Sequence, residues 1–183
     1  MRRIREILAV FATLTTMLAV GFASPAMAAQ GTPVASAETI TISGAVVTPL
    51  TLSVDDLKTY PTETIDVTYT AGGDPQEHSF TGTPLLSVLE AAEFDVPEDA
   101  HNPLLSTYIV VVAKDGYQVV LSGGEMDPAF GDQPVYLAWE QDGEPLSGDD
   151  GTVRLVVPGD TKGGRYVSGI VSIEVKMLEP VAQ

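Results

Sequence analysis

The sequence predicts an α+β domain with a mixed, mostly antiparallel β-sheet and two or three short helices. Three observations predict it: about seven short runs have strand-like alternation or β-branched content, few segments have helical spacing, and strands and helices do not alternate in βαβ order. We expect a signal peptide at 1–28, a flexible leader at 29–37, the folded domain at 38–178 and a tail at 179–183.

The first 28 residues have the pattern of a secretory signal peptide. Three arginines within the first five residues precede an apolar stretch at 7–22, and 26–28 reads Ala-Met-Ala, a cleavage signal. The predicted location is therefore extracytoplasmic, either secreted or in the periplasm or cell envelope, with no transmembrane anchor after cleavage. General and twin-arginine export both stay open, because Glu6 follows Arg2-Arg3 where a twin-arginine signal usually has an apolar residue.

The bulk composition excludes several functions. The chain has 183 residues, a formal net charge of −16 and no cysteine. Such an acidic chain lacks the basic footprint that binding to nucleic acid or anionic lipid requires. The absence of cysteine excludes thiol nucleophiles, thiolate zinc sites and covalent haem attachment.

The first half of the domain is predicted to contain two strands and two short helices. Thr39–Val47 has the pattern of a strand, and Ser53 with Asp56 forms a capping box for a short helix ending at Leu57. Thr64–Thr70 alternates like a half-buried strand, and 71–79 is predicted as a polar loop. A helix follows, with Thr83 as its cap, Pro84 at its first position and an apolar face on Leu85, Leu86, Leu89 and Ala92.

The second half of the domain is predicted to be strands joined by turns. Asp115-Gly116 between Thr107–Ala113 and Tyr117–Leu121 predicts a β-hairpin. Val135–Trp139 is a strand before a turn at 141–144, and two terminal strands are expected at Val153–Val157 and Ile170–Val175. Trp139 and the tyrosines at 108, 117 and 136 are expected in the core.

A Gly-rich segment between the terminal strands is the main candidate site. It carries Lys162 and Arg165 around Gly163 and Gly164, so backbone N–H groups and two cations could converge on an anion. The alternative is a surface hairpin whose glycines provide turn geometry. The segment is not a P-loop, because the Gly-x-x-x-x-Gly-Lys-Ser/Thr pattern is absent.

Other constellations carry weaker signals. His78 and His101 are expected as solvated loop residues, with no spacing that suggests a metal site. An acidic cluster (Asp142, Glu144, Asp149, Asp150) could offer oxygen ligands to calcium but lacks the order of a calcium loop. No Gly-x-Ser-x-Gly elbow supports a serine hydrolase.

Four ordered segments resemble the molybdopterin-binding domain of the sulfite oxidase family. They are Thr81-Gly82-Thr83-Pro84-Leu85-Leu86, Lys114-Asp115-Gly116-Tyr117, Arg154-Leu155-Val156-Val157-Pro158-Gly159, and the closing run Ile170–Val175. Together they cover about residues 40 to 176. The resemblance implies an α+β fold that binds a pterin-dithiolene cofactor, molybdopterin, whose phosphate needs cations.

The same resemblance assigns cofactor-binding residues and reveals one departure. Arg154 and Arg165 match basic positions of the family motif, and Lys162 is their neighbour. With Gly163 and Gly164 of the Gly-rich segment, they form the predicted cofactor-binding set. In catalytic members a Cys supplies a thiolate to molybdenum, whereas the corresponding region here, 69–73, reads Tyr-Thr-Ala-Gly-Gly. A Thr hydroxyl is a poor replacement, because it is not ionised near neutral pH and molybdenum chemistry favours soft thiolate.

Three readings of the function therefore stay open. The leading one is a non-catalytic, exported module that binds a pterin-like or other phosphorylated small molecule, or a protein partner, through the set just named. The second is a molybdopterin-dependent oxidoreductase whose metal is held by the dithiolene and a hydroxyl or water alone. The third is a structural cell-surface interaction domain.

Overall fold

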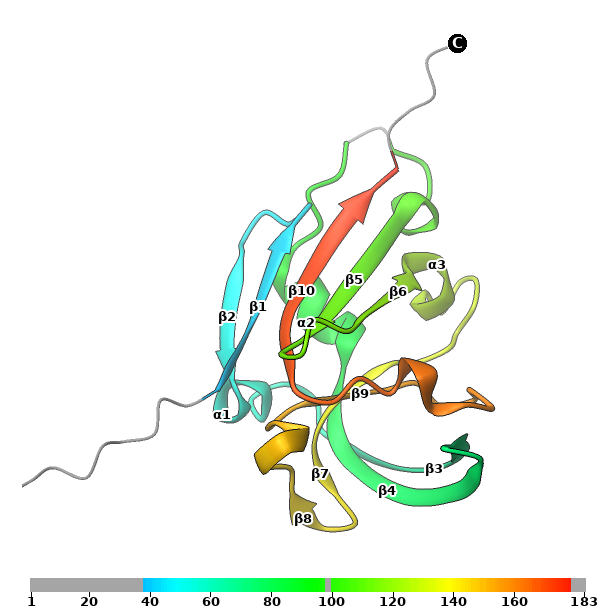
Figure 1. Ribbon diagram of the computed structural model, residues 1–183. Helices are drawn as coiled ribbons and strands as arrows, with labels where there is room; N and C mark the ends of the chain where they lie inside the picture. Colours follow the sequence, from blue (N-terminus) through cyan, green and yellow to red (C-terminus); the bar gives the residue numbers. More distant parts are fainter. Residues whose placement is uncertain (1–37, 98–99, 179–183) are drawn as a thin grey trace, which may run out of the picture. The chain divides into compact units, whose positions relative to one another are not determined.

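The computed structural model describes residues 38–97 and 100–178, which form two β-sheets with three short α-helices (Figure 1). The expected signal peptide, leader and tail lie outside the described residues. The strands are β1 Thr39–Gly44, β2 Leu50–Ser53, β3 Glu63–Ala71, β4 Asp74–Pro84, β5 Thr107–Ala113, β6 Gln118–Ser122, β7 Tyr136–Gln141, β8 Glu144–Pro145, β9 Arg154–Val156 and β10 Ile170–Met177. The helices are α1 Val54–Leu57, α2 Leu85–Ala92 and α3 Gly123–Met126, with 3-10 turns η1 Pro103–Ser106, η2 Gly148–Asp150 and η3 Gly163–Arg165.

The first sheet has the strand order β2-β1-β10-β5-β6. Its pairs are antiparallel except β1 with β10, which run parallel. Burial alternates along β5 and β6, so one face of this sheet is buried and the other faces outward. The Asp115-Gly116 hairpin between these two strands is present, with Gly116 at φ 85° as a turn of this kind requires.

The second sheet contains β3, β4, β7 and β8 in that order, with β9 also paired to β7. Its longest unit is the β3–β4 hairpin, in which a tight turn at Gly72 (φ 62°) and Gly73 (φ 97°) joins the two strands. Residues 71–79, expected as a loop, are therefore mostly strand. The two glycines reverse the chain within the turn, and the polar residues after them continue the ladder because they lie on a half-exposed strand.

The two helix starts differ in how well the sequence predicts them. Ser53 and Asp56 form the expected capping box, with Asp56 Oδ2 accepting from Ser53 N–H at 2.9 Å. Thr83 does not cap α2, since the N-cap is Pro84 and Thr83 lies buried in β4. The strand extends to the helix start, which leaves no loop in which Thr83 could turn its hydroxyl toward the helix.

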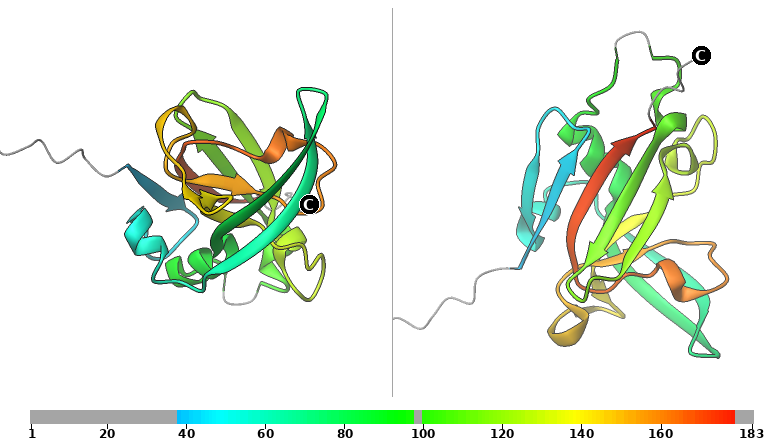
Figure 2. Two further views of the ribbon diagram at one scale, coloured as in Figure 1. Left: turned by 90° about the horizontal axis from the view of Figure 1, so that it is seen from below. Right: turned by 45° about the horizontal axis from the view of Figure 1, so that its top comes forward.

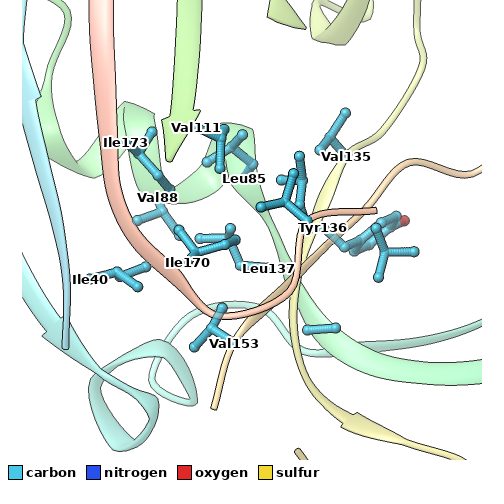
Figure 3. Close-up of a cluster of buried hydrophobic side chains, with 14 of the residues drawn as sticks. Ile40, Leu85, Val88, Val111, Val135, Tyr136, Leu137, Val153, Ile170 and Ile173 are labelled. Carbon is cyan, nitrogen blue, oxygen red and sulfur yellow. The ribbon is translucent and has the colours of Figure 1, made fainter. Parts of the chain in front are cut away.

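The hydrophobic core lies between the two sheets and α2 (Figure 3). The first sheet contributes Ile40, Val111 and Ile173, whereas α2 contributes Leu85 and Val88 and the second sheet contributes Leu137; all are at most 1% exposed. Trp139 and Tyr136 are buried as expected, but Tyr117 is 52% exposed. The expected fold class, a mixed and mostly antiparallel α+β domain, is confirmed.

The terminal strands do not form a hairpin with each other. β9 pairs with β7 in the second sheet, whereas β10 pairs with β1 and β5 in the first. The Gly-rich segment between them therefore crosses from one sheet to the other, and its turn η3 lies beside the tip of the β3–β4 hairpin (Figure 2).

Within 38–97 and 100–178, helices are all too short or too polar to cross a membrane.

Candidate functional site: the β3–β4 hairpin and the Gly-rich turn

The structure places the five sequence-predicted site residues on two neighbouring segments. Arg154 begins β9, and the other four occupy the turn around η3 (Gly163–Arg165), with Lys162 at its start. Lys162 forms a parallel bridge with Thr70 of β3, and Thr70 N–H donates to Thr161 O at 2.9 Å. The turn is thus attached to the strand that stands where the family has its thiolate segment.

Arg165 is already paired with carboxylates. Its Nε and Nη2 donate to the two oxygens of Asp160, Nε to Oδ2 at 2.9 Å, and Nη1 lies 3.4 Å from Glu125 Oε2. The hydrogen bonds that Arg165 donates to Asp160, and then the negative charges of Asp160 and Glu125, raise the pKa of Arg165. A bidentate pair of this kind occupies the guanidinium edge that would otherwise grip a phosphate.

Arg154 is held in a different environment. Its Nη1 donates to Gln141 Oε1 at 2.9 Å, and its guanidinium carbon lies 5.8 Å from the centre of the Phe80 ring. That distance allows a cation–π contact. Its Nε is buried and has no hydrogen-bond partner among the described residues, so one donor of this side chain is unsatisfied.

Lys162 and the two glycines complete the turn. Lys162 is exposed, and within the described part of the chain it is in no ion pair. A Cβ on Gly163 would lie 2.9 Å from the Tyr69 ring, so the lack of a side chain allows this close approach. Gly164 has open space around it, and its carbonyl accepts from the Tyr117 hydroxyl at 2.8 Å.

An aromatic cluster fills the space under the turn. Tyr69 and Tyr166 stack with centroids 4.1 Å apart and an interplanar angle of 24°, and Phe80 and His78 lie at the cluster's edge. The Tyr166 hydroxyl is buried without a hydrogen-bond partner among the described residues. Burial, with the nearby Tyr69 and Asp160, raises the pKa of Tyr166 to about 12.

His78 is part of this site, which the sequence did not indicate. It lies on β4 with its side chain 22% exposed, and its Nδ1 is 2.8 Å from Asp142 Oδ2. Asp142 also accepts from Ser79 N–H at 2.9 Å. This backbone hydrogen bond, followed by the contact with His78, lowers the pKa of Asp142. His78 and Phe80 are two residues apart, the period of a strand, and this spacing could have predicted that His78 lies on a strand.

A hollow of about 700 Å³ lies on the outward face of the hairpin. Its lining comes from residues 66–70 of β3, 75–77 of β4 and the loop 158–161. The charged residues in this lining are Asp66, Glu77 and Asp160, and none of the five predicted site residues lines it. A second hollow of about 420 Å³ beside it adds His78 and Asp142 to Asp66 and Glu77.

The residues at this place do not fit the molybdenum-loaded cofactor. Between Tyr69 and Asp74 the chain offers a threonine, an alanine and two glycines, hence no soft ligand for the metal. No group of three or more His, Cys, Asp or Glu in the described ranges could hold a metal ion. The adjoining hollow is lined by carboxylates, which would repel a phosphate and a dithiolene.

Comparison with solved structures supports the fold. The sulfane dehydrogenase SoxCD from Paracoccus pantotrophus is similar, with a TM-score of 0.60 and 20% sequence identity, over 78% of this chain and 39% of that chain. At this identity the likeness shows the fold alone, and the chain spans well under half of the SoxCD chain. No curated protein matches the sequence.

Comparison with protein families covers nearly the whole domain. Residues 29–181 match the family described as the oxidoreductase molybdopterin binding domain. This stretch includes both sheets, the β3–β4 hairpin and the Gly-rich turn. The chain belongs to the oxidoreductase molybdopterin binding domain family, and molybdopterin is therefore a possible ligand.

Proposed function

We propose that this chain is an exported, non-catalytic member of its family that acts as a binding module. One observation carries the proposal: β3 runs directly into β4 through a Gly-Gly turn at the place where the family resemblance puts the metal-binding cysteine. The chain has no cysteine that could supply a thiolate, and the tight turn leaves no loop at this place. Without that ligand, the protein contributes no thiolate bond to molybdenum.

The electrostatics of the site favour the same proposal. Of the predicted cations, Arg165 is neutralised by Asp160 and Glu125, and Arg154 is fixed over Phe80. The adjoining hollow presents carboxylates. Molybdopterin carries its negative charge on the phosphate and the dithiolene, and when bound with metal it supplies oxygen-atom transfer. This chain's residues would repel such a ligand at the hollow.

Metal content tests the non-catalytic role. The full chain is produced in a host that makes molybdopterin, beside a cysteine-containing member of the family as control. We expect the control to contain about one molybdenum per chain by elemental analysis, and this protein to contain neither molybdenum nor the fluorescence of released pterin. Stoichiometric molybdenum together with viologen-linked reduction of a sulfoxide or N-oxide would establish the oxidoreductase alternative instead.

Anion binding by the Gly-rich turn is a second candidate. Lys162 is exposed and unpaired among the described residues, and Arg154 retains an unsatisfied Nε. Phosphate or a pterin phosphate would then bind more weakly to Lys162→Ala, with Lys58→Ala as the control, because Lys58 is an exposed lysine at the C-cap of α1 that pairs with Asp55. Unchanged binding in both variants would exclude this turn.

Export is tested separately. We expect the protein in the extracytoplasmic fraction, with a mass that corresponds to cleavage after Ala28. Full-length protein retained in the cytoplasm would contradict the proposed location.

A further inference from the structure

The outer edge of β3 carries unpaired backbone groups. Ala71 and Asp74 close the two-residue turn and form a hydrogen-bonded pair. On β3, every second residue counted back from Ala71 is therefore also hydrogen-bonded to β4. The backbone N–H and C=O groups of the residues between them point away from β4, as the N–H of Thr70 does when it donates to Thr161 O. The N–H and C=O groups of Thr64, Asp66 and Thr68 therefore face outward.

Only the end of this edge is covered. The Gly-rich segment runs parallel to β3 at the Thr70–Lys162 bridge and then turns into η3. Among the described residues, β3 has β4 as its only strand partner along its nine residues. Natural edge strands are usually short or blocked, because an open one pairs with any extended chain. This edge is long and open over Thr64 to Thr68.

The hollow lies where an added strand would place its side chains. Asp66 and Thr68 alternate on the outward face of β3, and Glu77, opposite Thr68 on β4, lies on the same face. All three line the hollow, and the loop 158–161 forms its far wall. A chain paired with β3 would therefore set alternate side chains beside Asp66 and Glu77.

Charge selects the partner. Asp66 and Glu77 are exposed and are in no ion pair within the described part of the chain, whereas Asp160 is neutralised by Arg165. A second copy of this chain would oppose acidic edge to acidic edge, and the whole sequence has a net charge of −16. A lysine or arginine at every second position of a peptide would instead face the two carboxylates.

We propose that the open edge of β3 and its acidic hollow bind an extended, Lys- or Arg-rich peptide segment as an added β-strand. Backbone hydrogen bonds to Thr64, Asp66 and Thr68 would hold the segment, and Asp66 with Glu77 would select its cations. The inference deepens the proposed binding role and rests on it. The site needs no metal or pterin, so its test is independent of the molybdenum analysis.

The probe is a blocked nine-residue peptide in which lysine alternates with threonine, matched in length to β3. We expect saturable binding by calorimetry, slower amide hydrogen exchange at Thr64, Asp66 and Thr68, and weaker binding at high salt. A peptide of the same sequence with N-methylated backbone amides keeps its charges but has no N–H to donate to β3, so it should bind far more weakly.

Two protein variants separate charge from strand pairing. Asp66→Asn with Glu77→Gln should weaken binding by about two- to thirtyfold, as expected for two exposed ion pairs. Thr68→Pro removes an outward N–H and no bond to β4, so it should abolish strand addition while the fold is retained. The matched control, Asp149→Asn with Asp150→Asn on η2, removes equal charge from an exposed turn and should bind normally.

The outcomes are distinct. Equal affinity of the N-methylated peptide, or of the Thr68→Pro variant with an unchanged circular dichroism spectrum, would show non-specific charge attraction and overturn the proposal. Absence of peptide binding to the wild-type chain at millimolar concentration would also overturn it. If the wild-type chain instead forms a dimer that Thr68→Pro dissociates, the edge serves self-association and the proposed partner is wrong.

Discussion

Two buried tyrosine hydroxyls provide a sharp test of the structure, because removing them should have opposite effects. Tyr136 donates its hydroxyl hydrogen to Glu63 Oε2 at 2.8 Å, whereas the Tyr166 hydroxyl has no partner among the described residues. Both side chains are 6% exposed, and burial is the largest cause that raises the pKa of each to about 12. Tyr136→Phe should therefore destabilise the fold, and Tyr166→Phe should not.

The magnitudes follow from the hydrogen bonds. A bond to a carboxylate contributes about 1.5 to 3 kcal/mol, and because Glu63 is exposed we expect Tyr136→Phe to cost about 1 kcal/mol. An unsatisfied buried hydroxyl costs about 1 to 3 kcal/mol, so Tyr166→Phe should leave stability unchanged or raise it by about 1 kcal/mol. Its stacking on Tyr69 is retained, since phenylalanine keeps the ring.

The assay is urea unfolding followed by circular dichroism, with equal m-values required for the wild type and both variants. We expect the two variants to differ by about 1 to 2 kcal/mol in their free energy of unfolding. The reasoning is refuted if Tyr166→Phe is the more destabilised variant, because the hydroxyl would then have a partner such as an ordered water.

Two further predictions concern the same region. Because the pKa of about 12 for Tyr136 and Tyr166 exceeds the ordinary value of 10.0, the unfolded chain binds fewer protons, and stability should fall as the pH rises from about 10 to 12. The double Phe variant should fall less over this range, which unfolding at fixed pH measures. Gly163→Ala should cost about 1 to 3 kcal/mol, because its Cβ would meet the Tyr69 ring at 2.9 Å. Gly164→Ala, with open space around it, is the control and should be nearly neutral, and urea unfolding of both variants measures the difference.

The sequence predicts best the elements that local chemistry determines. The Ser53 capping box and the Asp115-Gly116 hairpin depend on a few adjacent residues, and both are present. The prediction of a loop at 71–79 was wrong. The polar residues of this stretch suggested exposure to solvent, and its pairing with β3 is visible only in the structure. The prediction of Thr83 as the helix cap was also wrong, because β4 continues to the start of α2.

The site was harder to predict, because it depends on contacts between distant residues. Sequence alone found Arg154 and Arg165 by their place in the family motif. It could not show that Asp160 and Glu125 neutralise Arg165, since Glu125 lies 40 positions away in the chain. The same limitation applies to His78, whose partner Asp142 comes from the turn after β7. Whether the five predicted residues bind a ligand stays a prediction.

The position of β10 has a consequence for the order of synthesis. This strand ends the described chain, yet it lies in the middle of the first sheet, between β1 and β5. When the chain has been synthesised only up to Ile170, the first sheet consists of the pairs β1–β2 and β5–β6, with no strand between them. Such a nascent polypeptide must wait for its last strand before the sheet closes, because pairings this distant form late. The delay would keep the first sheet open until β10 has been synthesised, as the proposed export of an unfolded chain would require.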